Sequence, residues 1–188
     1  SVAPKLLPFN PEGLPAAIRE HPHWLVCDRT GRPVERGRLG DSKTNPDHWG
    51  DFATAAEIVA KEPGLWPYIV LTNDAPFTAF DVDFKPQKED ESDDHYLARI
   101  NRADAALEKL RDLFPRRYEA RSKSGNGFHI IVRGKFEGTG GKGKGEWSEV
   151  EVYTRKHGLA LTGHVLEGYT EPGTYSKRVQ HVRDMIKG

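Results

Sequence analysis

Phe80-Asp81-Val82-Asp83 is the most informative segment of the sequence, and it ends an apolar run that starts at Phe77. Alternate side chains of a β-strand share a face, so Asp81 and Asp83 point to the same side. Two carboxylates at the end of a buried strand repel each other, and a divalent cation removes that cost. The stretch therefore predicts a strand that presents paired carboxylates to Mg²⁺ or Mn²⁺. Taken alone it is equally compatible with a strand end whose two aspartates are solvated.

A second motif, Ser124-Gly125-Asn126-Gly127-Phe128-His129, follows about forty residues later. Its glycines permit positive φ angles and close backbone approach, so backbone N–H groups of the turn can surround an anion. His129 then begins the next strand, where its imidazole can donate to a phosphate oxygen with help from Lys123 and Arg121. The alternative is an ordinary hairpin turn followed by a half-exposed histidine.

The third motif is Glu149-Val150-Glu151-Val152-Tyr153, in which the two glutamates share one strand face and the two valines the other. A solvent-facing amphipathic strand explains this segment by itself. The three motifs in this order, followed by Leu159-Ala160-Leu161-Thr162-Gly163, are far less expected by chance than any one of them.

The charges are divided along the chain although their sum is zero, with 28 basic and 28 acidic residues. Residues 74–94 carry a balance of about −6, and residues 116–144 carry about +6. An acidic block that can hold metal beside a basic block that can hold phosphate suits phosphoryl transfer. A solvated surface explains much of both blocks, especially residues 89–94.

Length and composition describe a globular protein of 188 residues, enough for one domain or two small lobes with a shared core. A single cysteine, Cys27, excludes an intrachain disulfide and fits a cytoplasmic location. No run approaches the roughly 20 apolar residues of a membrane span, so we expect no association with membranes.

The order of helical and strand patterns favours an α+β fold over a doubly wound sheet. Helices are predicted over 52–61, after a capping Asp51, and from Ser92 to Pro115. Hairpins are predicted over 117–132 and 150–162, and strands at 68–71 and 78–84 are expected to be neighbours.

Two further segments carry expectations of their own. Residues 134–145, rich in Gly and Lys, predict a flexible loop whose lysines contact phosphate groups. Residues 176–188 predict a helix with Val179, Val182 and Ile186 on one face, which packs either on the core or on a following region.

The DxD strand, the S-G-x-G-x-H turn, the V-E-V-Y strand and the apolar-T-G strand together resemble the primase–polymerase domain of the archaeo-eukaryotic primase superfamily. The likeness is greatest to replication proteins of phages and plasmids, and it spans roughly residues 20–165, including Ser42-Lys43-Thr44-Asn45-Pro46. It implies a two-lobed α+β fold with mixed or antiparallel sheets and an RRM-like catalytic half. On this basis we expect a catalytic domain over 1–175, with an N-terminal lobe over about 1–66, a catalytic half over about 67–175, and a helix over 176–188 that leads to a helical or helicase region.

The same resemblance implies roles for individual residues. Those that would bind two Mg²⁺ or Mn²⁺ ions and carry catalysis are Asp81, Asp83 and Glu151, with Glu149 as an alternative to Glu151. Those that would hold the incoming nucleotide are Lys43, Lys123, Ser124, Gly125, Gly127, His129 and Thr162. One departure is Thr154, which stands where an acidic residue often follows the V-E-V-Y tyrosine.

The implied activity is DNA primase–polymerase chemistry, with nucleoside triphosphates and single-stranded or primed DNA as substrates. Two other functions remain open on the residues alone. A metal-dependent nuclease would use similar carboxylates, but Val152 occupies the place of its usual strand-borne lysine. A non-catalytic RRM-type nucleic-acid-binding module would need strand aromatics for base stacking, and these are sparse.

Overall fold

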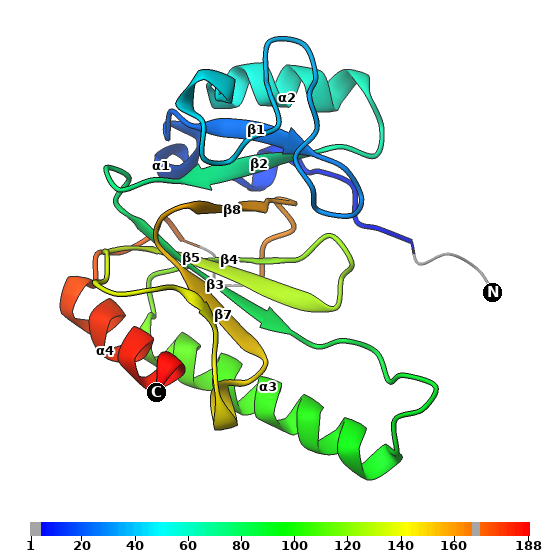
Figure 1. The fold of residues 1–188 in the computed structure, drawn as a ribbon, viewed down its shortest axis with the longest axis vertical. Coiled ribbons are helices and arrows are strands. Elements are labelled where there is room, and N and C mark those ends of the chain that lie inside the picture. Colours follow the sequence, from blue (N-terminus) through cyan, green and yellow to red (C-terminus); the bar gives the residue numbers. More distant parts are fainter. Residues whose placement is uncertain (1–4, 167–169) are drawn as a thin grey trace.

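The computed structural model describes residues 5–166 and 170–188, which form an α+β fold with two antiparallel sheets (Figure 1). The three-stranded sheet has the order β1-β2-β8, and the five-stranded sheet the order β4-β5-β3-β7-β6. The strands are β1 Trp24–Cys27, β2 Trp66–Leu71, β3 Phe77–Asp83, β4 Tyr118–Arg121, β5 Gly127–Arg133, β6 Gly141–Lys142, β7 Val150–Tyr153 and β8 His157–Ala160.

Four α-helices occur in the described part of the chain, with three short 3-10 helices. The helices are α1 Ala16–Arg19, α2 Phe52–Lys61, α3 Asp93–Leu113 and α4 Ser176–Lys187, and the 3-10 helices are η1 Pro11–Gly13, η2 Pro46–His48 and η3 Gly145–Trp147. The predicted helices over 52–61 and from Ser92 are confirmed, as are their caps: Asp51 accepts from Thr54 N and Ser92 from His95 N. None of the helices in the described residues combines the length and apolarity that a bilayer span requires.

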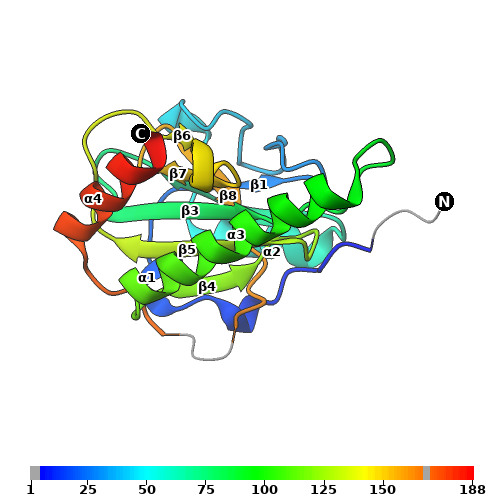
Figure 2. The ribbon, with the colours of Figure 1, turned by 90° about the horizontal axis from the view of Figure 1, so that it is seen from below.

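One face of the five-stranded sheet is covered by α3 and α4 (Figures 1 and 2). Phe80 and Val82 of β3 point to this side, as alternation along a strand requires. The apolar stripe of α4, formed by Val179, Val182 and Ile186, is fully buried here. The stripe therefore packs on the chain's own core, which was one of the two outcomes expected from the sequence.

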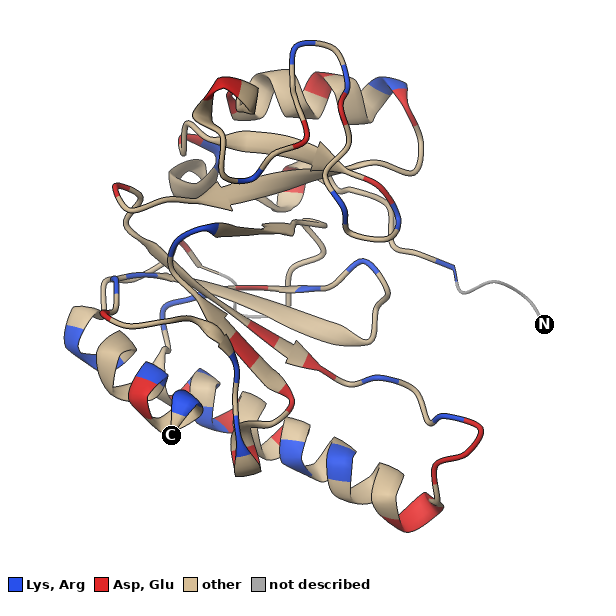
Figure 3. Cartoon of the chain, viewed as in Figure 1, with Lys and Arg blue, Asp and Glu red and all other residues tan. Residues whose placement is uncertain are grey.

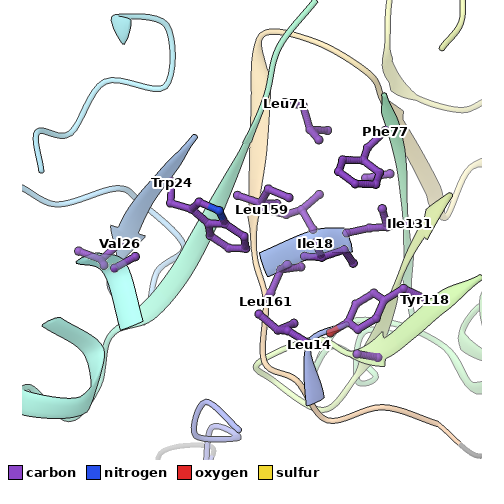
Figure 4. Packing of buried hydrophobic residues seen from close by; sticks show 14 of the residues in the cluster. Leu14, Ile18, Trp24, Val26, Leu71, Phe77, Tyr118, Ile131, Leu159 and Leu161 are labelled. Carbon is purple, nitrogen blue, oxygen red and sulfur yellow. The ribbon is translucent and has the colours of Figure 1, made fainter. Parts of the chain in front are cut away.

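The opposite face of the five-stranded sheet is half apolar and half charged. Its apolar half, which includes Phe77, Ala79 and Ile131, packs against α1 and residues of the three-stranded sheet such as Trp24 and Leu159 (Figure 4). Asp81 and Asp83 continue the same face of β3 beyond this core. The core thus fixes the strand that carries the two carboxylates, and leaves their end of the sheet open.

Two of the predicted strand pairings are wrong. The hairpin over 117–132 forms as β4 and β5, but β8 pairs with β2 in the other sheet and not with β7, and β2 and β3 lie in different sheets. The chain crosses between the sheets at Thr72 and at Thr154. Lys135 connects the two crossing segments, since its Nζ donates hydrogen bonds to the backbone carbonyls of Thr72 and Thr154. Burial in this position lowers the pKa of Lys135 to about 8.

The segment predicted as a flexible loop also differs from expectation. Within residues 134–145 the structure contains β6, which pairs with β7, and Lys144 N donates to Ile186 O of α4. Gly143 is required by this packing, because a Cβ there would lie 2.3 Å from the carbonyl oxygen of Trp147. The glycines of the segment therefore permit close contact between backbones as well as turns.

Candidate functional site

A row of four ionisable side chains crosses the open end of the five-stranded sheet. His129 of β5 lies opposite Asp81 of β3, Asp81 lies opposite Glu151 of β7, and Glu151 lies opposite Lys142 of β6. Directly paired residues of antiparallel strands project to the same face, with Cβ atoms about 5 Å apart. Figure 3 shows the acidic ends of β3 and β7 beside each other. Asp83, two residues after Asp81, adds a third carboxylate to this face.

His129 and Asp81 form the most buried part of this row. His129 is 7% exposed, and its Nε2 lies 3.6 Å from Asp81 Oδ2. Burial alone favours the neutral imidazole, but the charges of Asp81 and Asp83 outweigh it and raise the pKa of His129. Burial likewise opposes ionisation of Asp81, yet His129 outweighs it and lowers the pKa of Asp81. The pair is therefore stabilised as an imidazolium and a carboxylate.

Asp83 shows the effect of crowding like charges. Burial raises the pKa of Asp83, and the charges of Asp81 and Glu151 raise it further. Its nearest cation is Lys85, whose Nζ lies 3.7 Å from Asp83 Oδ2. The carboxylates thus carry an excess of negative charge that a single lysine offsets only in part.

Glu151 is held by Tyr153, whose hydroxyl donates to Glu151 Oε1 over 2.6 Å. The Tyr153 ring stacks on His157 of β8, with ring centroids 3.5 Å apart and planes inclined by 15°. Burial and the nearby charge of Lys43 lower the pKa of His157 to about 4, so its ring is neutral at physiological pH. Glu149 is instead bound by Arg102 of α3, with Nε to Oε2 at 3.0 Å. Because its charge is already neutralised, Glu149 is a weaker candidate for the third carboxylate than Glu151.

The three carboxylates at this end of the sheet form a set of ligands that suits a hard divalent cation. Asp81, Asp83 and Glu151 supply only oxygen ligands, the type that Mg²⁺ and Mn²⁺ prefer. The described residues contain no ready-made cluster of three or more His, Cys, Asp or Glu side chains placed as metal ligands. The reason is visible in the contacts: each of the three carboxylates faces a different partner, namely His129, Lys85 and Tyr153. Rotation of these side chains toward one another is required before a cation can be shared.

The turn between β4 and β5 is shaped by its two glycines. Gly125 has φ +77°, and a Cβ on Gly127 would lie 2.8 Å from the carbonyl oxygen of Val82. The backbone N–H of Gly125 donates to Ser122 O, and that of Asn126 to Ser124 Oγ. These two N–H groups are bonded within the turn, so they are not available to an anion as the sequence suggested. The side chains of Lys123, Ser124 and His129 line the adjoining cleft and are the remaining candidates for contact with an anion.

A cleft with a volume of about 490 Å³ lies between the two sheets and joins these features. Its lining includes Asp81, Asp83, Lys43, Lys123, Ser124 and His129, all predicted from the sequence. The turn glycines Gly125 and Gly127 shape the cleft without lining it, and Glu151 lines a neighbouring pocket instead. A cleft of this size falls in the range that binds a drug-sized or nucleotide-sized ligand.

Thr162 does not belong to the cleft. It is fully buried, its hydroxyl donates to Arg121 O over 2.6 Å, and its Oγ1 accepts from His164 N. Its assignment to nucleotide binding is therefore corrected to a structural role, since no surface of the side chain is left for a ligand.

Several cleft residues were not singled out from the sequence. They enter from the three-stranded sheet and its loops, and they are Arg32, Tyr68 and His157. The local sequence around Arg32 and His157 is polar and typical of turns, and it gives no indication that these residues reach the cleft.

The chain matches no protein-family model, and no curated protein sequence matches it either.

Proposed function

We propose that this chain is a DNA primase–polymerase catalytic domain that transfers nucleotides in the replication of a phage, plasmid or other mobile element. The observation that carries the proposal is the row His129–Asp81–Glu151, which brings all three sequence motifs to one end of one sheet. The strand order β4-β5-β3-β7, with α3 linking β3 to β4, supports the RRM-like half that the resemblance implies.

The residues of the cleft divide into two chemical groups. Lys43, Lys123, Ser124 and His129 supply cationic and hydroxyl contacts suited to a triphosphate. The wall formed by Tyr68, Leu159 and Ala160 offers apolar surface suited to a nucleoside. A nucleoside triphosphate therefore matches both groups of lining residues.

Asp81, Asp83 and Glu151 would hold the divalent cations. When bound, such ions favour ionisation of an attacking 3′-hydroxyl and offset the charge of a leaving pyrophosphate. The protein's own contribution is position and charge: His129, whose pKa is raised, lines the cleft with Lys43 and Lys123, and the three would offer positive charge to the triphosphate.

One assay separates this activity from its alternatives. The protein is incubated with a 5′-labelled primer on a longer template, with each nucleotide pool in turn and Mn²⁺ or Mg²⁺. The proposal predicts extension of the primer in a template-dependent order. Shortening of the primer would instead indicate a nuclease, and a mobility shift without a change in primer length would indicate a binding module.

A further inference from the structure

A second pocket lies on the far side of the carboxylates from the nucleotide cleft. It has a volume of about 340 Å³, and Asp83 lines both it and the cleft. Glu151 forms part of its wall, with Lys85, Lys88 and Lys142 around it. Asp83 thus adjoins two pockets, and lysine side chains line both of them.

The charges of the second pocket are not all compensated. Arg99 is paired with Glu91 at 2.8 Å, and Glu149 with Arg102 at 3.0 Å. Lys85 faces Asp83. Lys88 and Lys142 are exposed, and no carboxylate of the described residues lies within ion-pair distance of their ammonium groups. Two free cations therefore remain in the pocket, ready for an anionic ligand.

The position of Lys142 is fixed by the sheet and not by a free loop. It lies directly opposite Glu151, so its side chain projects to the same face as the carboxylates. The short strand β6 is held in turn by hydrogen bonds between its flanking residues and β7 and α4. The cation is consequently presented next to the proposed reaction centre in the absence of any ligand.

The lining of the second pocket also defines what it can bind. Every residue of the wall is charged except Ser148, and no aromatic or aliphatic side chain is present for a base. The nucleotide cleft, by contrast, has the wall formed by Tyr68, Leu159 and Ala160. The second pocket therefore suits a sugar–phosphate backbone whose bases lie elsewhere.

We infer that this pocket holds the terminal phosphodiesters of the acceptor strand, with Lys88 and Lys142 as the phosphate contacts. The inference rests on the proposed function and deepens it. In a nucleotidyl transfer the strand's 3′-hydroxyl oxygen bonds to the α-phosphorus of the nucleotide, the bond to pyrophosphate breaks, and the hydroxyl proton is released to solvent. Both reactants must meet at the same carboxylates, and among the described residues Asp83 lines both pockets, with Asp81 in the cleft and Glu151 in the second pocket.

The test compares the double variant Lys88→Ala/Lys142→Ala with the control Lys61→Ala/Lys109→Ala, which removes the same charge from lysines on α2 and α3 outside both pockets. Affinity for a 5′-labelled primer–template is measured over a range of salt concentrations, and KM is measured for primer and for nucleotide. We expect the first variant to raise the primer KM with no change in nucleotide KM, and to lower the salt slope by about 1 for each lysine removed. Lys88→Arg/Lys142→Arg should retain most of the wild-type primer affinity because it keeps both charges.

Three results would overturn the inference. If the wild type extends the primer and both double variants have the same primer KM, the pocket is not the acceptor site. The proposed polymerase function would be unaffected by that result. A loss of affinity for single-stranded template, without any change in primer KM, would assign the pocket to the template. Failure of the wild type to bind or extend primed DNA would contradict the function and the acceptor site together.

Discussion

Asp81 and Glu151 are direct cross-strand partners on β3 and β7, although seventy residues separate them in the chain. Like charges in directly opposite positions destabilise a sheet. Burial and the charges of these two neighbours also raise the pKa of Asp83, which is a further effect of the repulsion between carboxylates. A sheet that keeps three carboxylates together at one end carries a cost to folding that a bound cation would remove.

The first prediction concerns this cost. Asp83→Asn should raise the melting temperature in the absence of divalent ions, because it removes a charge that the folded state disfavours. Addition of Mn²⁺ should raise the melting temperature of the wild type and have a much smaller effect on the variant, since ligands that bind only the folded state stabilise it. Scanning calorimetry with and without Mn²⁺ measures both effects. An equal Mn²⁺ shift in the two proteins would exclude Asp83 as a ligand.

His129→Ala should weaken nucleotide binding while leaving DNA binding unchanged. A charge-assisted hydrogen bond to phosphate contributes about 1.5–3 kcal/mol, so a loss of roughly 10- to 150-fold in affinity is expected. Equilibrium binding of a labelled nucleotide checks this. The control is His95→Ala on α3, whose side chain is 68% exposed and lies outside the cleft. Equal nucleotide affinity in the two variants would leave His129 with a purely structural role.

Thr162→Val separates structure from binding. The substitution removes the hydroxyl that donates to Arg121 O at a fully buried position, so it should lower the free energy of unfolding by about 1–3 kcal/mol. Nucleotide KM should not change. A chemical denaturation curve gives the free energy of unfolding, and a steady-state titration gives the nucleotide KM. A raised KM in a fully stable variant would show that Thr162 takes part in nucleotide binding.

Stability at acid pH should depend on Glu119 of β4. Burial opposes its ionisation, but hydrogen bonds from Arg111 and Arg117 outweigh burial and lower the pKa of Glu119. A lowered pKa contributes stability above the ordinary value of 4.5, and this contribution is lost as pH falls below that value.

Glu119→Gln should therefore destabilise the fold by about 3–5 kcal/mol at neutral pH, because it breaks a buried charge pair. The difference from wild type should shrink as the pH is lowered from 4.5 toward 2. The control Glu57→Gln, at an exposed pair with Lys61, should leave the unfolding curve unchanged. A pH-independent difference for Glu119→Gln would indicate lost packing and not a lost charge interaction.

Features that depend on local sequence patterns could be predicted from the sequence. Alternation along a strand placed Asp81 and Asp83 on one face, and cap residues located α2 and α3. The α+β class also followed from the order of the patterns. These features depend on residues within a few positions of one another.

Pairings between distant strands could not be predicted in this way. The polar segment Lys156-His157-Gly158 has the composition of a hairpin turn, but the chain passes there from one sheet to the other, with Lys156 at φ 53°. That crossing brings His157 onto Tyr153 and into the cleft. Thr162 lies beyond the end of β8, and only the tertiary structure shows that its hydroxyl is bonded to Arg121 O.

In the proposed function Glu151, and not Glu149, acts with Asp81 at the reaction centre. The most direct test is the rate of single-nucleotide addition to a primed template by the wild type, Glu151→Gln and Glu149→Gln, with melting temperatures measured alongside. We predict addition by the wild type and by Glu149→Gln, and no detectable addition by a folded Glu151→Gln protein. Addition at the wild-type rate by Glu151→Gln would contradict this assignment.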